Sequence, residues 1–185
     1  MNTHAPPSLA LQQHALLRAL RGRPGAAAAD AAETPLLDLL DGYARDPMGG
    51  GEPLSDYARN NLPQALAARP FLFSVLAFAD SAQTQPIGLI NCVEGFSTFA
   101  SRPLVNVHDV VVAAPYRGQG VAEQMLRLVE ELARQRGACK LTLEVLSGNQ
   151  SAMTLYRRIG FDNYQLDPHA GQAQFMQKWL DQGLA

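Results

Sequence analysis

The fold is decided by the stretch Val110-Val111-Val112-Ala113-Ala114-Pro115-Tyr116-Arg117-Gly118-Gln119-Gly120-Val121-Ala122, which predicts a strand, a glycine turn and the start of a helix. Such a turn leaves several backbone N–H groups without carbonyl partners, and the helix macrodipole adds partial positive charge beside them. Gly118 and Gly120 let the backbone approach a ligand, because no Cβ stands in the way. The turn is therefore predicted to bind a phosphate or pyrophosphate group.

The alternative interpretation is a structural turn that binds nothing, because glycine between a strand and a helix is common. Two better-known phosphate motifs do not fit. No Gly-Lys-Ser/Thr follows the turn, which excludes a Walker loop. The glycine spacing and the position two-thirds of the way along the chain argue against a dinucleotide fingerprint.

A second motif, about thirty residues further on, favours the phosphate interpretation. Lys140 to Val145 is apolar at alternate positions, which predicts a strand. The segment Asn149 to Phe161 then begins with a good N-cap residue, carries an apolar face and reaches Gly160, which predicts a helix that ends there.

At these residues the chain resembles the GNAT superfamily of acetyl-coenzyme A-dependent N-acetyltransferases. The matching features are the Arg-x-x-Gly-x-Ala turn at 117–122 and the later Leu-Glu-Val…Asn-x-x-Ala-x-x-Leu-Tyr-x-x-x-Gly-Phe, which ends at Phe161. The resemblance implies an acyltransferase that uses acetyl-coenzyme A, needs no metal, and transfers acetyl to a primary amine by direct attack. A catalytically silent coenzyme A-binding sensor is the alternative.

The predicted fold is mixed α/β, with a central, mostly antiparallel sheet and helices on both faces, as in GNAT-like N-acyltransferases. Residues 1–34 are predicted to form an N-terminal segment with a strand near Ala15–Leu20 and a connection over 22–34. Residues 35–185 form the N-acetyltransferase domain of a single-domain chain. Helices are expected from Pro35, with Thr34 as its cap, over Ser55–Ala68, after Gly118 and after Asn149. Strands are expected at Phe71–Ala79, Ile87–Glu94, Leu104–Val112, Ala138–Leu146, Phe161–Leu166 and Ala173–Leu180, with an irregular connection over Gly95–Pro103.

The resemblance implies two groups of cofactor contacts besides the helix at Asn149. The backbone of Val110, Val111 and Val112 would pair with the pantetheine arm, which acts as a surrogate strand. The pyrophosphate would lie on the turn residues Arg117, Gly118, Gln119, Gly120, Val121 and Ala122. Asn149 would lie beside the pantetheine arm, with a simple N-cap as the alternative.

His108 and Tyr156 are the candidate catalytic residues. Amine acetylation needs a neutral nucleophile, and histidine can remove its proton directly or through a water. Glu94, Asp109 and a water are the rival bases, and a hydrogen-bonded core histidine is the structural alternative. Tyr156 is the candidate acid that protonates the departing thiolate, with a packing role as its alternative.

Strand alternation predicts how the side chains before the turn are distributed. One face would hold Asn106, His108, Val110 and Val112, and the other Val107, Asp109 and Val111. The acceptor pocket is expected from the two early helices, the 95–103 connection and the loop Asp46–Pro53, whose three consecutive glycines predict a mobile lid.

Composition limits the partners. The 185 residues are 47% hydrophobic, and 15 basic against 17 acidic side chains give a net charge of −2 without a block of one sign. This argues against nucleic acid and membrane partners and leaves a small-molecule amine or a peptide as acceptor. Cys92 and Cys139 lie in predicted strands and suggest buried thiols in a cytoplasmic protein. A homodimer is left open.

Overall fold

The computed structural model describes residues 10–12, 27–164, 167, 169, 171 and 173–180. The chain divides into two compact units, Met1–Leu143 and Glu144–Ala185, which are treated separately below. The strand expected near Ala15–Leu20 lies outside the described residues.

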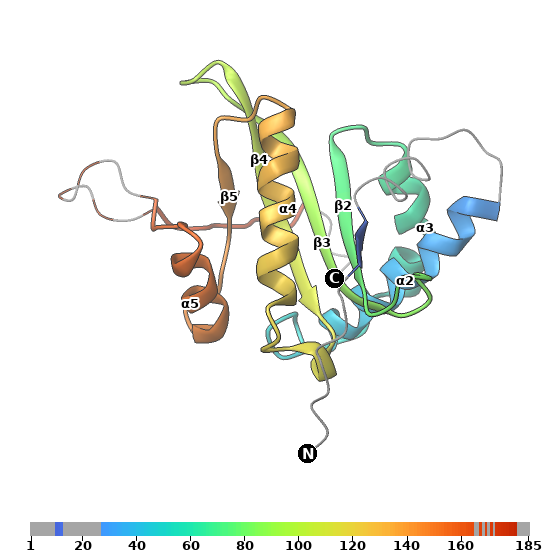
Figure 1. The fold of residues 1–185 in the computed structure, drawn as a ribbon. Coiled ribbons are helices and arrows are strands. Elements are labelled where there is room, and N and C mark those ends of the chain that lie inside the picture. Colours follow the sequence, from blue (N-terminus) through green and yellow to red (C-terminus); the bar gives the residue numbers. More distant parts are fainter. Residues whose placement is uncertain are drawn as a thin grey trace. The chain divides into compact units, whose positions relative to one another are not determined.

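The first unit is built on a five-stranded sheet with the order β1-β2-β3-β4-β5 (Figure 1). The strands are β1 (Ala10–Gln12), β2 (Leu72–Phe78), β3 (Pro86–Ser97), β4 (Arg102–Val112) and β5 (Leu141–Leu143). The first four strands pair in antiparallel fashion, and β5 runs parallel to β4. The predicted mixed, mostly antiparallel sheet is confirmed.

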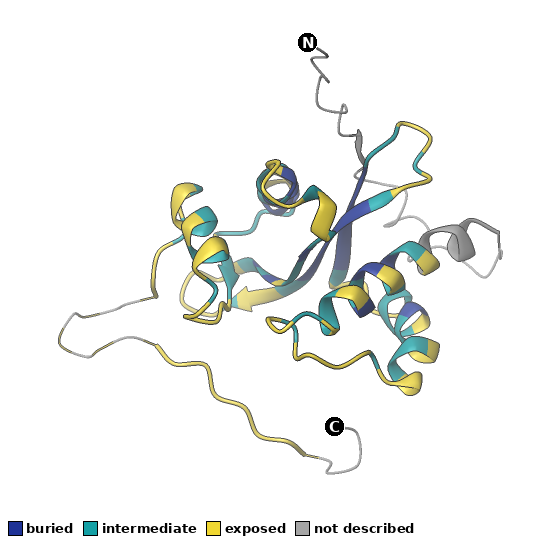
Figure 2. Cartoon of the chain, turned by 90° about the horizontal axis from the view of Figure 1, so that it is seen from below, coloured by how far each residue is buried: buried dark blue, intermediate teal, exposed yellow. Residues whose placement is uncertain are grey.

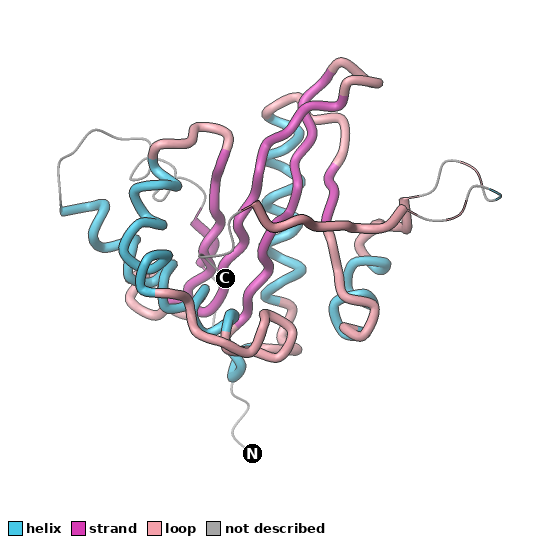
Figure 3. Tube along the Cα trace, turned by 180° about the vertical axis from the view of Figure 1, so that it is seen from behind, coloured by secondary structure: helices cyan, strands magenta, loops and turns pink. Residues whose placement is uncertain are grey.

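Helices cover both faces of this sheet, as predicted (Figures 1 and 3). Helix α4 (Val121–Gln135) lies on one face and buries the predicted apolar stripe of Val121, Met125, Leu128, Val129 and Leu132. On the opposite face, α2 (Ala27–Ala44) packs Leu36 and Leu39 against strand residues that include Leu89 and Val111. Helix α3 (Asp56–Ala67) follows, with Ser55 as its N-cap. Buried residues accordingly follow the strands and the inward sides of these helices (Figure 2).

The start of α2 was predicted wrongly. The helix begins at Ala27, so Thr34 and Pro35 lie inside it and residues 27–34 are not an irregular connection. Alanine has the highest helix propensity, and the alanine-rich run before Thr34 carries the helix up to the proline. Pro63 likewise lies within α3 and does not end it.

Four strand predictions also need correction. The connection expected over Gly95–Pro103 is largely a hairpin, because β3 continues to Ser97, which pairs with Arg102 at the start of β4. Strand β5 is only three residues long. The described residues of 161–166 and 173–180 lie in no strand, and 173–180 are exposed (Figure 2). Alternation shows that a segment could pair, but it does not supply a partner strand.

A buried carboxylate ties α2 to α3. Asp41 is 6% exposed, and its Oδ2 accepts hydrogen bonds from Arg45 Nε at 2.9 Å and Arg59 Nη2 at 2.7 Å. Its Oδ1 accepts from the Leu54 N–H at 2.9 Å, at the end of the loop that joins the helices. The Arg45 hydrogen bond in particular lowers the pKa of Asp41 to about 2, against the opposing effect of burial.

Replacing Asp41 by asparagine should lower the free energy of unfolding by about 1–3 kcal/mol, because hydrogen bonds to a charged group are lost. Urea denaturation at neutral pH measures this, and Asp38→Asn, an exposed position on the same helix, is the matched control. The folded-state pKa lies below the ordinary 3.8, so the contribution is complete above that value and is lost as the pH falls through about 2. The stability gap between wild type and variant should therefore narrow over that window. A constant gap would contradict the assignment.

Candidate active site

Strand β4 has an open edge next to the glycine turn. The Ala113 N–H donates to the Ile87 carbonyl at 2.8 Å, so the backbone of alternate residues, including Val111, faces β3. The N–H and C=O groups of Val110 and Val112 consequently face the other edge. Strand β5 pairs with β4 only from Val105 to Val107. Val110 and Val112 can thus pair with an extended ligand, whereas the backbone of Val111 cannot.

A β-bulge interrupts β4 at His108. Asn91 of β3 pairs with Asp109, but the next residue, Cys92, pairs with Val107, which leaves His108 as the extra residue. The bulge overturns the predicted alternation. Val107 and Val110 pair with Cys92 and Ile90, alternate residues of β3, and so share one face of the sheet. His108 and Asp109 together take the place of one residue between them.

The bulge brings Asp109 onto the face opposite α4, beside Asn91, and leaves His108 exposed. The Asn91 Nδ2 group donates to Asp109 Oδ2 at 2.9 Å. Asn106, on the same strand, donates through Nδ2 to Thr142 Oγ1 of β5 at 3.2 Å. Two titratable side chains predicted to lie on opposite faces are therefore neighbours at the point where β4 leaves β5.

The glycine turn has the conformation expected of an anion site. Gly118 and Gly120 have φ values of +73° and +80°, which favour glycine. A Cβ built on Gly118 would meet nothing within 4 Å, and one on Gly120 would meet only Gln124 Nε2 at 3.9 Å. The first bond of α4 runs from the Gln124 N–H to the Gly120 carbonyl at 3.1 Å, so the N–H groups of Val121 and Ala122 precede it. Open space beside helix-terminal N–H groups fits a pyrophosphate.

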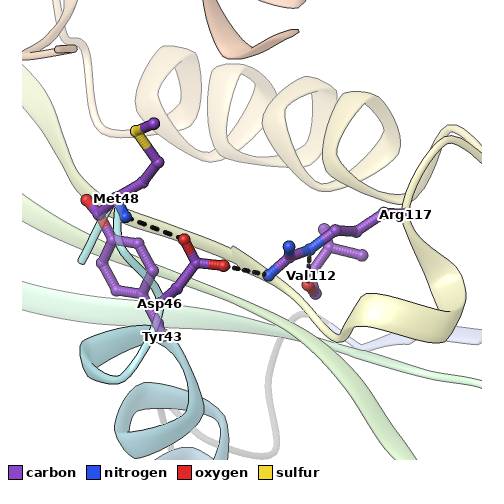
Figure 4. A network of polar contacts seen from close by, with 5 residues as sticks. All are labelled: Tyr43, Asp46, Met48, Val112 and Arg117. Carbon is purple, nitrogen blue, oxygen red and sulfur yellow. Dashed lines mark hydrogen bonds and ion pairs between the residues drawn. The ribbon is translucent and has the colours of Figure 1, made fainter. Parts of the chain in front are cut away.

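Arg117 joins this turn to two other segments (Figure 4). Its Nε donates to the Val112 carbonyl at 3.0 Å, and its Nη2 lies 3.0 Å from Asp46 Oδ2 in the loop after α2. Asp46 also accepts from the Met48 N–H at 2.9 Å. These two hydrogen bonds, the Met48 one foremost, lower the pKa of Asp46. Sequence reasoning missed Asp46, because it is 71 residues from Arg117.

The loop after α2 has a defined conformation, although its glycines predicted a mobile lid. The Gly49 N–H donates to the Asp46 carbonyl at 2.7 Å, and the Gly51 N–H to the Ala44 carbonyl at 2.9 Å. A Cβ on Gly49 would collide with the Tyr43 carbonyl. Gly50 and Gly51 have positive φ values. The glycines therefore serve the close approach and the turn of this loop.

Glu94, one of the rival bases, has a structural partner. Its Oε2 lies 2.9 Å from Arg136 Nη1 at the end of α4. The same guanidinium lies 4.3 Å from the centroid of the Phe73 ring. This arrangement gives Glu94 a role in packing α4 onto the sheet, and leaves His108 and Asp109 as the candidate bases near the open edge.

The second unit contains α5 (Gln150–Arg158) and the other two predicted site residues. Asn149 is the N-cap of this helix, since its Oδ1 accepts from the Ala152 N–H at 3.2 Å. Tyr156 is half-buried and meets Phe161 edge to face, with ring centroids 5.9 Å apart. The N-cap prediction for Asn149 is confirmed. Its contact with the pantetheine arm and the acid role of Tyr156 stay predictions.

Two further features concern partners. Among the described residues, no group of three or more His, Cys, Asp or Glu side chains could hold a metal ion. In the same part of the chain, no helix combines the length and apolar character needed to span a membrane.

A model of the acetyltransferase (GNAT) family matches residues 36–161, more than half of the chain. The chain belongs to the GNAT acetyltransferase family. The match includes both motifs and the candidate base, so the resemblance seen in the sequence is confirmed. The family is one of acyltransferases.

Two GNAT relatives have informative names. The chain is 35% identical over 98 residues to thialysine N-epsilon-acetyltransferase from Bos taurus, which covers 49% of this chain and 56% of that protein. It is 35% identical over 92 residues to streptothricin acetyltransferase from Streptomyces lavendulae, or 48% of this chain and 49% of that protein. The chain thus spans about half the length of the curated relatives it matches.

Solved GNAT-type structures share the fold over nearly the whole chain. A ribosomal-protein-alanine N-acetyltransferase from Brucella melitensis biovar Abortus 2308 has a TM-score of 0.60 at 18% identity, covering 92% of this chain and 98% of that chain. An aminoglycoside acetyltransferase from an uncultured soil metagenomic sample has a TM-score of 0.65 at 12% identity, covering 94% and 95%. At these identities the likeness shows the fold alone.

Proposed function

We propose that the chain transfers an acetyl group from acetyl-coenzyme A to a primary amine of a small-molecule or peptide acceptor by direct attack. The observation that carries this proposal is the open edge of β4, which leads straight into the glycine turn. The edge offers the backbone groups of Val110 and Val112, and the turn offers helix-terminal N–H groups with open space beside Gly118 and Gly120. An extended ligand that ends in a pyrophosphate matches both.

The residues of this edge divide the work of the proposed reaction. Acetyl-coenzyme A, when bound, supplies the acetyl group as an activated thioester. Val110 and Val112 hold the extended arm by backbone pairing and so fix the position of the acetyl group. His108, beside them at the bulge, takes the proton from the acceptor amine. Tyr156 gives a proton to the thiolate as it leaves.

The acceptor is a proposal that rests on the relatives' names. The two relatives at 35% identity are named as acetyltransferases of thialysine and of streptothricin. These names support a small-molecule amine as acceptor. They do not select one, because each match covers only about half of either chain.

An acetyl-transfer assay across a panel of amines tests the proposal. The purified full chain, acetyl-coenzyme A and each amine are incubated, free thiol is followed with a thiol-reactive chromophore, and acetylated product is identified by mass spectrometry. Reactions without acceptor correct for hydrolysis and for the thiols of Cys92 and Cys139. Acetylated amine supports the proposal. Coenzyme A binding by calorimetry without turnover on any amine would favour the sensor.

Tyr156→Phe should lower kcat by about 10–10³-fold, because the only acidic proton of the side chain is lost while its ring remains. The thiolate of coenzyme A is a tolerable leaving group, with a thiol pKa of about 8.5, so the acid helps without being obligatory. An acyl donor with a more acidic thiol should therefore restore much of the rate. Tyr57→Phe, at a tyrosine that is 64% exposed, is the control. Equal impairment on both donors would make Tyr156 a packing residue.

A further inference from the structure

A row of hydrogen-bonded polar side chains crosses the sheet and ends at Asp109. Ser74 of β2 pairs in register with Asn91 of β3, which pairs with Asp109 of β4. The Ser74 hydroxyl donates to Asn91 Oδ1 at 2.6 Å, and Asn91 Nδ2 donates to Asp109 Oδ2 at 2.9 Å. Ser74 and Asn91 are only 4% and 8% exposed. This row is the only place where described, uncharged polar side chains are buried to this extent.

The row fixes the orientation of the carboxylate. Because the Ser74 hydroxyl donates to the carbonyl oxygen of Asn91, the amide nitrogen must point the other way, toward Asp109. A buried amide without partners would be costly, so both hydrogen bonds hold Asn91 in this orientation. Asp109 is therefore presented in one geometry beside the bulge, by residues that solvent does not reach.

The charge of Asp109 lacks a counter-ion within the part of the chain that the structure describes. The arginines of this region pair with other acids: Arg45 and Arg59 with Asp41, Arg117 with Asp46, and Arg136 with Glu94. The printed partner of Asp109 is a neutral amide. Its charge is felt nearby, since burial raises the pKa of Tyr43 and the charge of Asp109 raises it further. A half-buried carboxylate in such surroundings is stabilised by a cation.

We propose that Asp109 binds a second ammonium group of the acceptor, one that is not acetylated, and that the acceptor is therefore an amine with at least two positive charges. The inference rests on the proposed function, because it names the substrate class of the same site. Asn91 and Ser74 act as positioning residues for Asp109. Asp109 is one residue from His108 and from Val110, so its ammonium lies beside the edge where acetyl transfer takes place.

The test compares 1,5-diaminopentane with pentylamine, which has the same chain length and only one amine. Wild type should prefer the diamine in kcat/KM. Asp109→Asn should reduce this preference by about 10–10²-fold through the KM of the diamine, since a charged hydrogen bond is lost, and should leave pentylamine within about threefold. Ser74→Ala should reduce it in the same direction by about 3–10-fold. Glu52→Gln removes the same charge from an exposed loop residue and should leave the preference unchanged.

Three results would overturn the inference. Equal kcat/KM for the two amines in wild type would overturn it while leaving the proposed function intact. An equal fall on both amines in Asp109→Asn would make Asp109 the base. A preference that survives Ser74→Ala and Asp109→Asn unchanged would exclude the row from substrate selection. Circular dichroism checks the fold, and Ser74→Ala carries the test if Asp109→Asn does not fold. Release of thiol with neither amine, nor with any other in the panel, would instead refute the proposed function.

Discussion

Gly120→Glu is expected to abolish binding of coenzyme A, with a loss of at least about 10²-fold in affinity. The side chain would enter the open space beside the turn, where only Gln124 Nε2 lies within 4 Å of a Cβ. That space is where the helix-terminal N–H groups would meet a pyrophosphate, so the variant adds both bulk and negative charge to an anion site. Isothermal titration calorimetry with coenzyme A measures the effect directly and does not depend on knowing the acceptor.

Backbone strain has to be separated from this effect, because Gly120 has a φ of +80° and any side chain there costs about 1–2 kcal/mol. Gly137 provides the matched control. It follows the other end of α4, has a φ of +74°, and a Cβ there would meet nothing within 4 Å. Gly137→Glu should therefore suffer the same strain and keep coenzyme A affinity. If folded Gly120→Glu binds as tightly as wild type, the turn is not the cofactor site.

The parts of the fold that the sequence predicts well depend on local interactions. The stripe of α4, the N-cap at Asn149 and the strand–turn–helix at Val110–Ala122 each follow from residues within a few turns of one another. The start of α2 is also local, but alanine carries no periodic pattern, so the helix before Thr34 was interpreted as a connection. Pro35 strengthened that error, because proline is common in the first turn of a helix.

The bulge could not be predicted, because it is a property of two strands. Alternation assumes a period of two along a single strand, and the sequence of β4 does not show that Asn91 faces Asp109 while Cys92 faces Val107. The error affects the site directly. It separated His108 from Asp109 and hid the row that leads from Ser74 through Asn91.

Contacts between distant segments were missed for a similar reason. Arg117 was predicted to contact the pyrophosphate from its place in the motif, and its pairing with Asp46 needs the loop after α2 to fold back to β4. The loop glycines were interpreted as a sign of mobility, whereas the Gly49 N–H bonds the Asp46 carbonyl and leaves no room for a side chain. Motifs thus identified the cofactor side of the site, and the acceptor side needed the structure.

His108→Ala is expected to lower kcat/KM by about 10²–10⁴-fold, the range for loss of a general base. The bulge supports this role, because it leaves the imidazole exposed next to the open edge of β4, where water and an acceptor amine can reach it. Coenzyme A affinity should not change, since the backbone groups of Val110 and Val112 and the glycine turn remain. His169→Ala, at an exposed histidine of the second unit, is the matched control and should keep full activity.

The pH dependence decides between His108 and its rivals. A base must be deprotonated to act, so the kcat/KM profile of the wild type should fall on the acidic side, and His108→Ala should lose that limb along with most of its rate. Glu94→Gln removes a carboxylate that already pairs with Arg136, so it should reduce stability and leave the profile unchanged. If His108→Ala keeps the acidic limb and Asp109→Asn loses it for every amine, the base is Asp109. In that case the bulge would serve to aim the carboxylate at the amine, and His108 would be an exposed residue beside it.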